Sequence, residues 1–330
     1  MSDADIAVVI VTYKSASLTI ESLASLHAER EIQQQNIHVF VIDNASGDFP
    51  QVAEAVERQG WSSWVTVILA PRNGGFSYGN NIGIRSAYER GRPKYIYLLN
   101  PDTQVRPRAI RTLVEFLESH PRVGIAGSSF ETEDGKDWPF AFRFPTLFSE
   151  FERGMQLGLI TRLLSRWTVP RTMNAVAQPT DWICGASMMI RPEVLTTIGC
   201  LDENFFLYYE ETEFCYRARQ AGFPTWYVPE SRVMHIIGKS TNVDDETRLS
   251  RRLPGYWFDS RRQYFASTHG IRVAALIDIV ALISSLLGLI RRKLLLRRST
   301  PRYIRDLWSH SILWQRNRAV APIKSYFPPG

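Results

Sequence analysis

The first half of the chain alternates short apolar runs with stretches of helical periodicity, and this alternation restricts the fold more than any other feature. Apolar runs that end at turns predict buried strands, and the patterns between them predict helices. Strands are expected at 7–11, 39–42, 65–69, 95–99 and 124–126, and helices at 17–28, 50–59, 78–90 and 107–119. This order is typical of a mostly parallel sheet with helices on both faces. The sequence therefore predicts an α/β fold.

The pattern changes beyond the fifth predicted strand. Residues 131–180 are rich in aromatic residues, Pro and Arg, and predict an irregular segment. Connections of this length are usually functional. An apolar run at 182–190, a helix at 211–221 and a strand at 225–228 are expected to follow.

Composition places the chain among globular proteins. Its 330 residues, 45% of them apolar, can form one large domain or two modest ones. The three cysteines have no C-x-x-C spacing, which predicts reduced thiols in a cytoplasmic protein and no zinc site. The polar residues at 1–5 predict no signal peptide.

Positive charge is concentrated at the C-terminal end. Residues 248–330 hold 16 Lys and Arg against 3 Asp, whereas the rest of the chain is mildly acidic. A basic region of this kind predicts an anionic partner: a lipid surface, a nucleic acid or a phosphorylated substrate. No nucleic-acid-binding motif accompanies the charge, so we expect no nucleic-acid partner.

One segment of this basic region is long and apolar. Residues 273–290 contain a single acid, Asp278, and basic residues flank both ends. Eighteen residues is the lower limit for a membrane span, and basic flanks on both sides disfavour one. A helix lying in a membrane surface is favoured, with Trp308 and Trp314 nearby. Packing against the body, a dimer interface and a span remain open.

Polar side chains follow several predicted strands at the point where each strand ends. Thr12 and Tyr13 follow the first strand, Asp43 the second and Asp102 the fourth. The carboxyl ends of parallel strands form the ligand-binding edge of such a sheet. Asp43 is interpreted either as a loop former or as a carboxylate that accepts hydrogen bonds from a nucleobase or ribose.

A Gly- and Asn-rich stretch spans residues 73–83. Its glycines and asparagines around a helix start, among them Asn73, Gly75 and Asn80, permit a close backbone approach to a ligand. The stretch matches neither the dinucleotide G-x-G-x-x-G pattern nor a P-loop. Capping of the helix is the competing interpretation.

Two residues are candidate metal ligands. Asp102 suits a hard cation such as Mg²⁺ or Mn²⁺, which retains substrate phosphates. His235, after the last predicted strand, would suit Mn²⁺ better, although a structural histidine is equally compatible with the sequence.

Three carboxylates cluster where the helix at 211–221 begins. Glu210, Glu211 and Glu213 follow the aromatic run at 205–209. Acids at a helix start interact favourably with its dipole, which is the structural interpretation. Adjacent acids beside aromatic residues also raise a carboxyl pKa, as a general base requires. We therefore predict a catalytic role.

Taken in order, these segments resemble the family 2 glycosyltransferases, particularly the bacterial rhamnosyltransferase-like branch. The anchors, within residues 5–240, are 11–13, Asp43-Asn44, 73–83, Asn100-Pro101-Asp102, Gly185-Ala186 and 206–217. The resemblance implies a GT-A fold with a Rossmann-like sheet. It divides the chain into a catalytic domain at 1–245, with a nucleotide-binding half at 1–128 and an acceptor half at 129–245, and a helical basic region at 246–330.

The resemblance also implies roles for single residues. Thr12, Tyr13, Asp43 and Asn73 would line the nucleotide pocket; Asp102 matches the family's metal-binding acid, and His235 a C-terminal metal ligand. Glu211 matches the second acid of the catalytic pair. The chain departs from the pattern at Asn100, where many members have Asp, and at Glu211, where Asp is usual. The second departure leaves open which of Glu210 and Glu211 is the base.

The function implied is inverting transfer of a sugar from a nucleotide-sugar donor, with a divalent metal. The branch suggests dTDP-rhamnose and an acceptor in bacterial surface polysaccharide synthesis, with UDP-sugars open. A polyprenyl-diphosphate-linked acceptor would place the protein at the inner face of the cytoplasmic membrane. A module that binds nucleotide sugars without turnover is the main alternative. A nucleotidyltransferase would need a Gly-rich basic loop that Lys14 does not supply.

Overall fold

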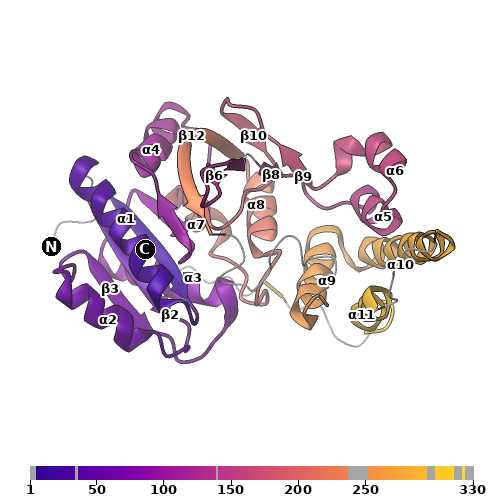
Figure 1. The fold of residues 1–330 in the computed structure, drawn as a ribbon, viewed down its shortest axis with the longest axis horizontal. Coiled ribbons are helices and arrows are strands. Elements are labelled where there is room, and N and C mark those ends of the chain that lie inside the picture. The colour runs from indigo at the N-terminus through magenta and orange to yellow at the C-terminus, as the bar shows by residue number, and fades with distance from the viewer. Residues whose placement is uncertain are drawn as a thin grey trace.

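The computed structural model describes residues 5–33, 36–138, 140–236, 252–295, 302–315 and 322–323. A central sheet forms the body of the protein (Figure 1). Its strands are β1 (Ile6–Thr12), β2 (Ile37–Asp43), β3 (Val65–Leu69), β4 (Tyr95–Leu99), β5 (Thr103–Val105), β6 (Ile125–Glu131), β7 (Asp137–Trp138), β10 (Gln178–Thr180), β11 (Ser187–Ile190) and β12 (Thr225–His235). A separate ribbon pairs β8 (Phe140–Phe142) with β9 (Pro170–Thr172).

The main path of the sheet runs β10-β12-β6-β11-β4-β1-β2-β3. Strands β4, β1, β2 and β3 are parallel, and β12 is parallel to β6. Strand β11 lies between β4 and β6 and is antiparallel to both, so β6 and β12 run in the direction of β4. The carboxyl ends of β1, β2, β4 and β12 therefore share one edge of the sheet.

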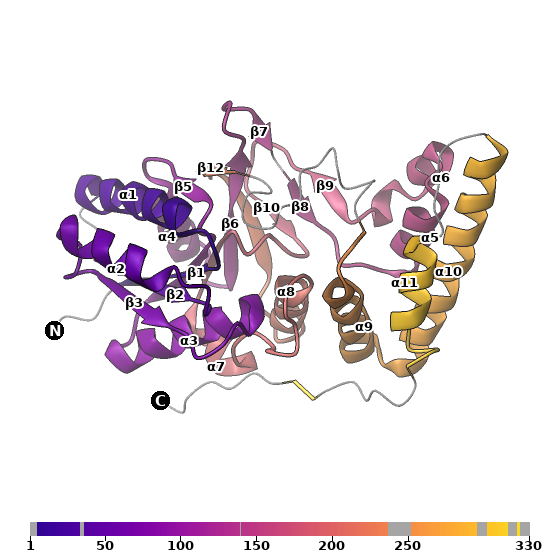
Figure 2. The same cartoon turned by 60° about the horizontal axis from the view of Figure 1, so that its bottom comes forward.

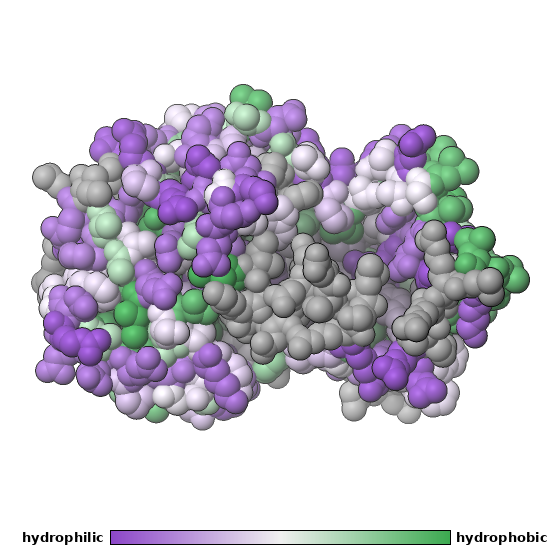
Figure 3. Space-filling model, in the orientation of Figure 1, coloured by the Kyte–Doolittle hydropathy of each residue, from purple (hydrophilic) through white to green (hydrophobic). Residues whose placement is uncertain are grey.

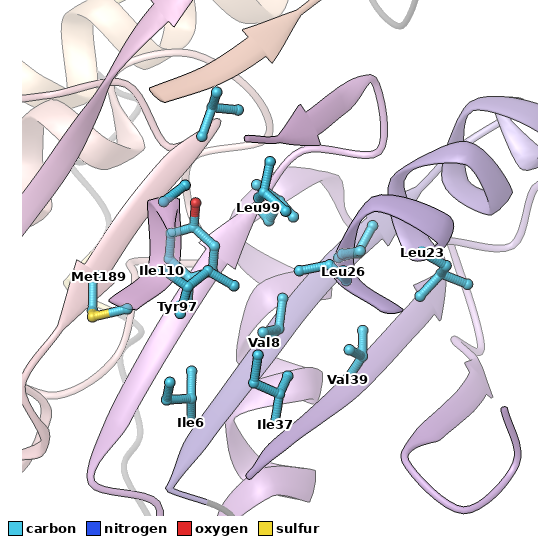
Figure 4. Close-up of a cluster of buried hydrophobic side chains, with 14 of the residues drawn as sticks. Ile6, Val8, Leu23, Leu26, Ile37, Val39, Tyr97, Leu99, Ile110 and Met189 are labelled. Atoms are coloured by element: carbon cyan, nitrogen blue, oxygen red, sulfur yellow. The ribbon is translucent and has the colours of Figure 1, made fainter. Parts of the chain in front are cut away.

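Helices cover both faces of the sheet, as the alternating sequence predicts. They are α1 (Ala16–Gln33), α2 (Phe49–Arg58), α3 (Gly75–Arg90), α4 (Ala109–Ser119), α7 (Pro192–Ile198) and α8 (Glu210–Gln220). Alternate residues of β1 enter different cores, because side chains of a strand point to opposite faces. Val8 packs in a core with Leu26 of α1 (Figure 4), whereas Val9 packs in the core that contains Ile84 of α3.

The segment 131–180 is more regular than expected. Besides short strands it forms α5 (Leu147–Met155), α6 (Gly158–Leu163) and a 3₁₀ turn, Ser165–Trp167. The prediction of an irregular loop was wrong here because α5 gains its stability from a distant partner. A Cβ on Gly288 would collide with the carbonyl oxygen of Gly154, so α5 packs closely on a helix far along the chain.

The C-terminal region is helical, as predicted. It comprises α9 (Gly255–His269), α10 (Ile271–Leu294) and α11 (Arg302–His310), which gather with α5 and α6 at one end of the molecule (Figure 2). The predicted boundary at residue 245 lies outside the described residues. By length and composition α10 could cross a membrane.

A buried ion cluster holds this helical end together. Arg261 of α9, only 1% exposed, contacts Glu150 of α5 at 2.7 Å and Asp278 of α10 at 2.5 Å. Asp278 also accepts a hydrogen bond from the backbone amide of Ile312. Asp278 of α10 therefore faces the protein interior.

Candidate active site

Strand pairing brings the two candidate metal ligands together. Asp102 lies in the turn after β4, and the next residue, Thr103, pairs with His235 across β5 and β12. Nε2 of His235 is 3.3 Å from Oδ1 of Asp102. The backbone amide of Ile236 also donates to the carbonyl of Asp102. Asp102 is 1% exposed, so this carboxylate and imidazole meet in a water-poor environment.

The chemistry of this pair fits a divalent cation that a substrate also coordinates. One carboxylate and one imidazole provide an oxygen and a nitrogen donor. Within the described ranges, no group of three or more His, Cys, Asp and Glu side chains could hold a metal. Mg²⁺ and Mn²⁺ are commonly held by one or two protein ligands together with substrate phosphates. The pair fits that mode of binding.

The two candidate bases begin α8, directly after a strained loop. Glu210 and Glu211 occupy its first turn, where the helix dipole favours negative charge. The preceding Tyr208 and Tyr209 have φ angles of 71° and 69°. Two consecutive non-glycine residues in the left-handed region are uncommon, and such backbone strain concentrates at functional sites.

Gly75 fixes the position of this loop. Its φ of +88° favours glycine, and a Cβ there would collide with the carbonyl oxygen of Phe206. The next residue, Phe76, donates its backbone amide to the same oxygen at 2.8 Å. The backbone at Gly75 therefore approaches the loop that leads to Glu210, and the approach of the 73–83 stretch to a ligand stays a prediction.

Burial raises the pKa of both candidate bases. The pKa of Glu210 lies well above its ordinary value because the side chain is desolvated and the charge of Glu211 is adjacent. The pKa of Glu211 is also raised by burial, although the backbone of Gly185 and the side chain of Glu210 act in the opposite direction. The two carboxyls thus favour sharing one proton.

Residues 184–186 lie near both the Asp102–His235 pair and the Glu210–Glu211 pair. The backbone amide of Asn100 donates to the carbonyl of Ala186, which places residues 184–186 beside the end of β4. Burial, together with the charges of Glu211 and Asp102, raises the pKa of the Cys184 thiol to about 12. The charges of Asp102 and Glu211 therefore both act on Cys184, so residues 184–186 lie near both pairs.

The predicted nucleotide-pocket residues near β1 and β2 make defined contacts. Thr12 is fully buried and donates to Oδ2 of Asp48, whereas Tyr13 is 42% exposed. Asp43 is also fully buried, and its carboxylate accepts hydrogen bonds from Ser46 and from the amide of Phe49. The structure thus gives Asp43 the loop-forming contacts; it leaves the nucleotide-binding interpretation untested.

The amide side chains of the 73–83 stretch form a local network. Asn44 donates to Oδ1 of Asn73 and to the carbonyl of Gly75. Asn80 donates to the carbonyl of Phe76, one turn back in α3. Asn73 thus contacts Asn44, the residue after β2, whereas the side chain of Asn80 is hydrogen-bonded within its own helix.

Several residues near the candidate site residues were not predicted from the sequence. Asp48 joins Thr12 to the backbone amide of Ser15, and Cys184 lies beside both acid pairs. Arg153 of α5 hydrogen-bonds Tyr209, the residue before Glu210. These contacts join residues far apart in the sequence, and no local pattern signals them.

The C-terminal helices also support the strained loop. Tyr209 packs against Trp257 and Tyr264 of α9, with ring centroids 5.7 and 5.4 Å apart. Tyr256 packs against Tyr208 in the same way. The C-terminal region, predicted as a separate helical basic region, therefore packs against the two tyrosines that precede Glu210 and Glu211.

Comparisons with known proteins are consistent with this geometry. A family model described as "Glycosyltransferase like family 2" matches residues 4–278. The N-acetylglucosaminyl-diphospho-decaprenol L-rhamnosyltransferase of Mycobacterium tuberculosis is 28% identical over 258 residues, covering 74% of this chain and 80% of that protein. The low-salt glycan biosynthesis hexosyltransferase Agl10 of Haloferax volcanii is 29% identical, covering 80% and 75%. The dTDP-rhamnosyl transferase RfbF of Shigella flexneri is 25% identical, covering 73% and 72%.

Solved structures share the fold at low sequence identity. GalNAc-T7 with UDP, GalNAc and Mn²⁺ superposes with a TM-score of 0.58 at 17% identity, over 90% of this chain. The chain spans about half of that protein, 55% of its length. The mannosyltransferase PcManGT from Pyrobaculum calidifontis, in complex with GDP-Man and Mn²⁺, gives 0.53 at 14% identity, over 96% of this chain and 83% of its own.

Proposed function

The chain belongs to the glycosyltransferase-like family 2 and has the GT-A fold, and from this membership we propose that it is a metal-dependent, inverting glycosyltransferase. The proposed reaction transfers a sugar from a nucleotide-sugar donor to a hydroxyl of a glycan or lipid-linked acceptor. The observation that carries it is the position of the Asp102–His235 pair and the Glu210–Glu211 pair around the same short segment, residues 184–186.

Glu211 is proposed as the general base. Burial raises its pKa, and a carboxylate with a raised pKa is a stronger base than an exposed one. Glu211 takes the proton of the acceptor hydroxyl while that oxygen attacks the anomeric carbon on the face opposite the leaving nucleoside diphosphate. Glu210, with the higher pKa, stays protonated beside it and spares the site a second negative charge.

Asp102 and His235 are proposed to hold the divalent cation. The donor's diphosphate would supply further oxygen ligands, as is common for Mg²⁺ and Mn²⁺. When bound, the cation neutralises the charge of the departing diphosphate. The imidazole of His235 favours Mn²⁺ over Mg²⁺.

The proposed donor is dTDP-rhamnose. Support comes from the similarity to RfbF and to the mycobacterial L-rhamnosyltransferase. A UDP-sugar donor is the alternative, because a hexosyltransferase is similar at the same level of identity. Thr12, Tyr13, Asp43, Asn73, Gly75 and Asn80 are proposed to shape the nucleotide side of the site, with Asp43 acting through its loop.

The proposed acceptor is a polyprenyl-diphosphate-linked glycan at the inner face of the cytoplasmic membrane. Support comes from the name of the mycobacterial relative, which acts on a diphospho-decaprenol acceptor, and from the basic C-terminal region. The product would serve surface polysaccharide synthesis.

A nucleotide panel tests the proposal. Thermal stability is measured with dTDP, UDP and GDP, each with and without Mn²⁺, because a ligand that binds the native state raises the melting temperature. We expect dTDP with Mn²⁺ to stabilise most and dTDP-rhamnose to release dTDP in the same buffer. Stabilisation by UDP alone would redirect the donor assignment, and binding without release from any donor would identify a non-catalytic module.

A further inference from the structure

Helix α10 presents its apolar side away from the protein. Its buried residues are mostly small or polar: Ala274, Ile277, Asp278, Ala281, Ser284, Ser285, Gly288 and Leu289. Its outer stripe is made of large aliphatic residues that are 40–55% exposed: Leu276, Ile279, Ile283, Leu286, Leu287 and Ile290. These recur at steps of three and four residues and so share one face. A helix on the surface of a soluble protein normally has the opposite arrangement.

Contacts on the inner side fix this orientation. Asp278 is paired with the buried Arg261, and the close approach of Gly154 to Gly288 leaves no room for a larger residue. Turning α10 over, or withdrawing it to span a bilayer, would separate Asp278 from Arg261 and leave Asp278 as an unpaired charge, which is strongly unfavourable. The aliphatic stripe is therefore a permanent part of the surface.

Basic and aromatic side chains surround the stripe. Arg272 and Lys293 are exposed at the two ends of α10. On the adjacent α11, Arg302 and Arg305 are exposed and Trp308 is 43% exposed. On α6, Leu159 and Leu163 are more than 60% exposed and add to the apolar surface at this end. Figure 3 shows hydrophobic residues gathered at the end of the molecule where Figure 1 places α10.

We infer that the outer face of α10 docks in the plane of an anionic lipid bilayer. The aliphatic stripe enters the boundary between headgroups and acyl chains, Arg272 and Lys293 contact lipid phosphates, and Trp308 lies at headgroup depth. Charge favours lipid over a second copy of the chain, because two copies meeting through this face would bring their arginines and lysines together. The inference does not depend on the proposed transferase chemistry.

Vesicle binding by the full chain tests this inference. We expect co-flotation with vesicles of phosphatidylcholine and phosphatidylglycerol, and weaker binding to phosphatidylcholine alone. The double variant Ile283→Glu/Leu287→Glu should lower binding at least tenfold. The double variant Arg272→Glu/Lys293→Glu should lower binding to the anionic vesicles only, by about fivefold or more for each charge lost.

A matched control separates this surface from exposed apolar residues in general. Leu69 ends β3, which lies at the other end of the molecule from α10 (Figure 1), and is 56% exposed, so Leu69→Glu makes the same chemical change away from α10. It should leave vesicle binding within twofold of the wild type. The inference is overturned if Ile283→Glu/Leu287→Glu binds vesicles normally. It is equally overturned if that variant only converts a dimer into a monomer in light scattering, with no vesicle binding by either protein.

Discussion

Nε2 of His235 lies 3.3 Å from Oδ1 of Asp102, although one residue follows β4 and the other ends β12. The pairing of β5 with β12 produces this contact, because it sets Thr103 opposite His235. Two residues that the sequence singled out for the same chemistry thus meet at the edge of the sheet where β4 and β12 end.

Loss of either member of this pair should weaken nucleotide binding that depends on metal. We expect Asp102→Asn and His235→Ala each to reduce Mn²⁺-dependent affinity for dTDP by about tenfold or more, the scale seen when metal sites lose supporting groups. Isothermal titration with and without Mn²⁺ measures this. Asp134→Asn, at an exposed acid, is the control. Unchanged Mn²⁺ dependence in both variants would remove the metal assignment.

Glu210 should make stability depend on pH. Because its folded-state pKa is raised, the folded protein keeps a proton that the unfolded chain releases above about pH 4.3. The stability that this proton confers is fully present below that pH and is lost as pH rises through the raised pKa. The melting temperature of Glu210→Gln should therefore rise relative to that of the wild type as the pH increases from 5 to 8. Parallel curves for the two proteins would contradict the raised pKa.

Gly75 should tolerate alanine poorly. The substitution combines a left-handed backbone with a collision against the carbonyl of Phe206, so we expect a loss of about 3 kcal/mol in the free energy of unfolding. Gly135 has a similar φ of +76° but open space around it. Gly135→Ala should therefore cost only about 1 kcal/mol. Urea denaturation compares them, and equal losses would show that the loop contact at Phe206 is unimportant.

Arg261 should be essential to the helical end. Arg261→Ala leaves the buried charge of Asp278 unpaired and Glu150 with Arg153 alone, and we expect it to lower the free energy of unfolding by roughly 3–5 kcal/mol. Arg252→Ala removes a similar pair, with Asp306, in which the arginine is exposed, and should have a much smaller effect. Chemical denaturation of both variants distinguishes them. Similar losses would mean that burial of the Arg261 cluster contributes little.

Periodicity predicted most of the sheet and its covering helices. The apolar run at 95–99 is β4 as expected, because a strand buried on both faces needs continuous hydrophobic residues, and the run at 65–69 is β3, a partly exposed strand at the end of the main path. The segment 131–180 was predicted less well. Helix α5 is short, and its stability depends on Gly154 meeting Gly288, a contact that local sequence does not encode.

The candidate site was also predicted only in part, because local sequence does not encode contacts between distant segments. Strand ends and the acid cluster drew attention to Asp102, His235, Glu210 and Glu211, which the structure brings around residues 184–186. The contact of Arg153 with Tyr209 joins two segments distant in the chain and has no sequence signature. The apolar segment 273–290 was expected to lie in a membrane surface, with packing against the body left open, and the structure buries its one acid, Asp278, beside Arg261.

Nucleoside diphosphate release measures the central claim most directly. With the donor that the nucleotide panel selects and Mn²⁺ present, Glu211→Gln should lower turnover by about 100-fold or more, the scale of losing a general base, while donor binding survives. Glu210→Gln keeps the shape of a protonated carboxyl and should retain much more activity. Near-normal turnover in Glu211→Gln together with none in Glu210→Gln would contradict the account.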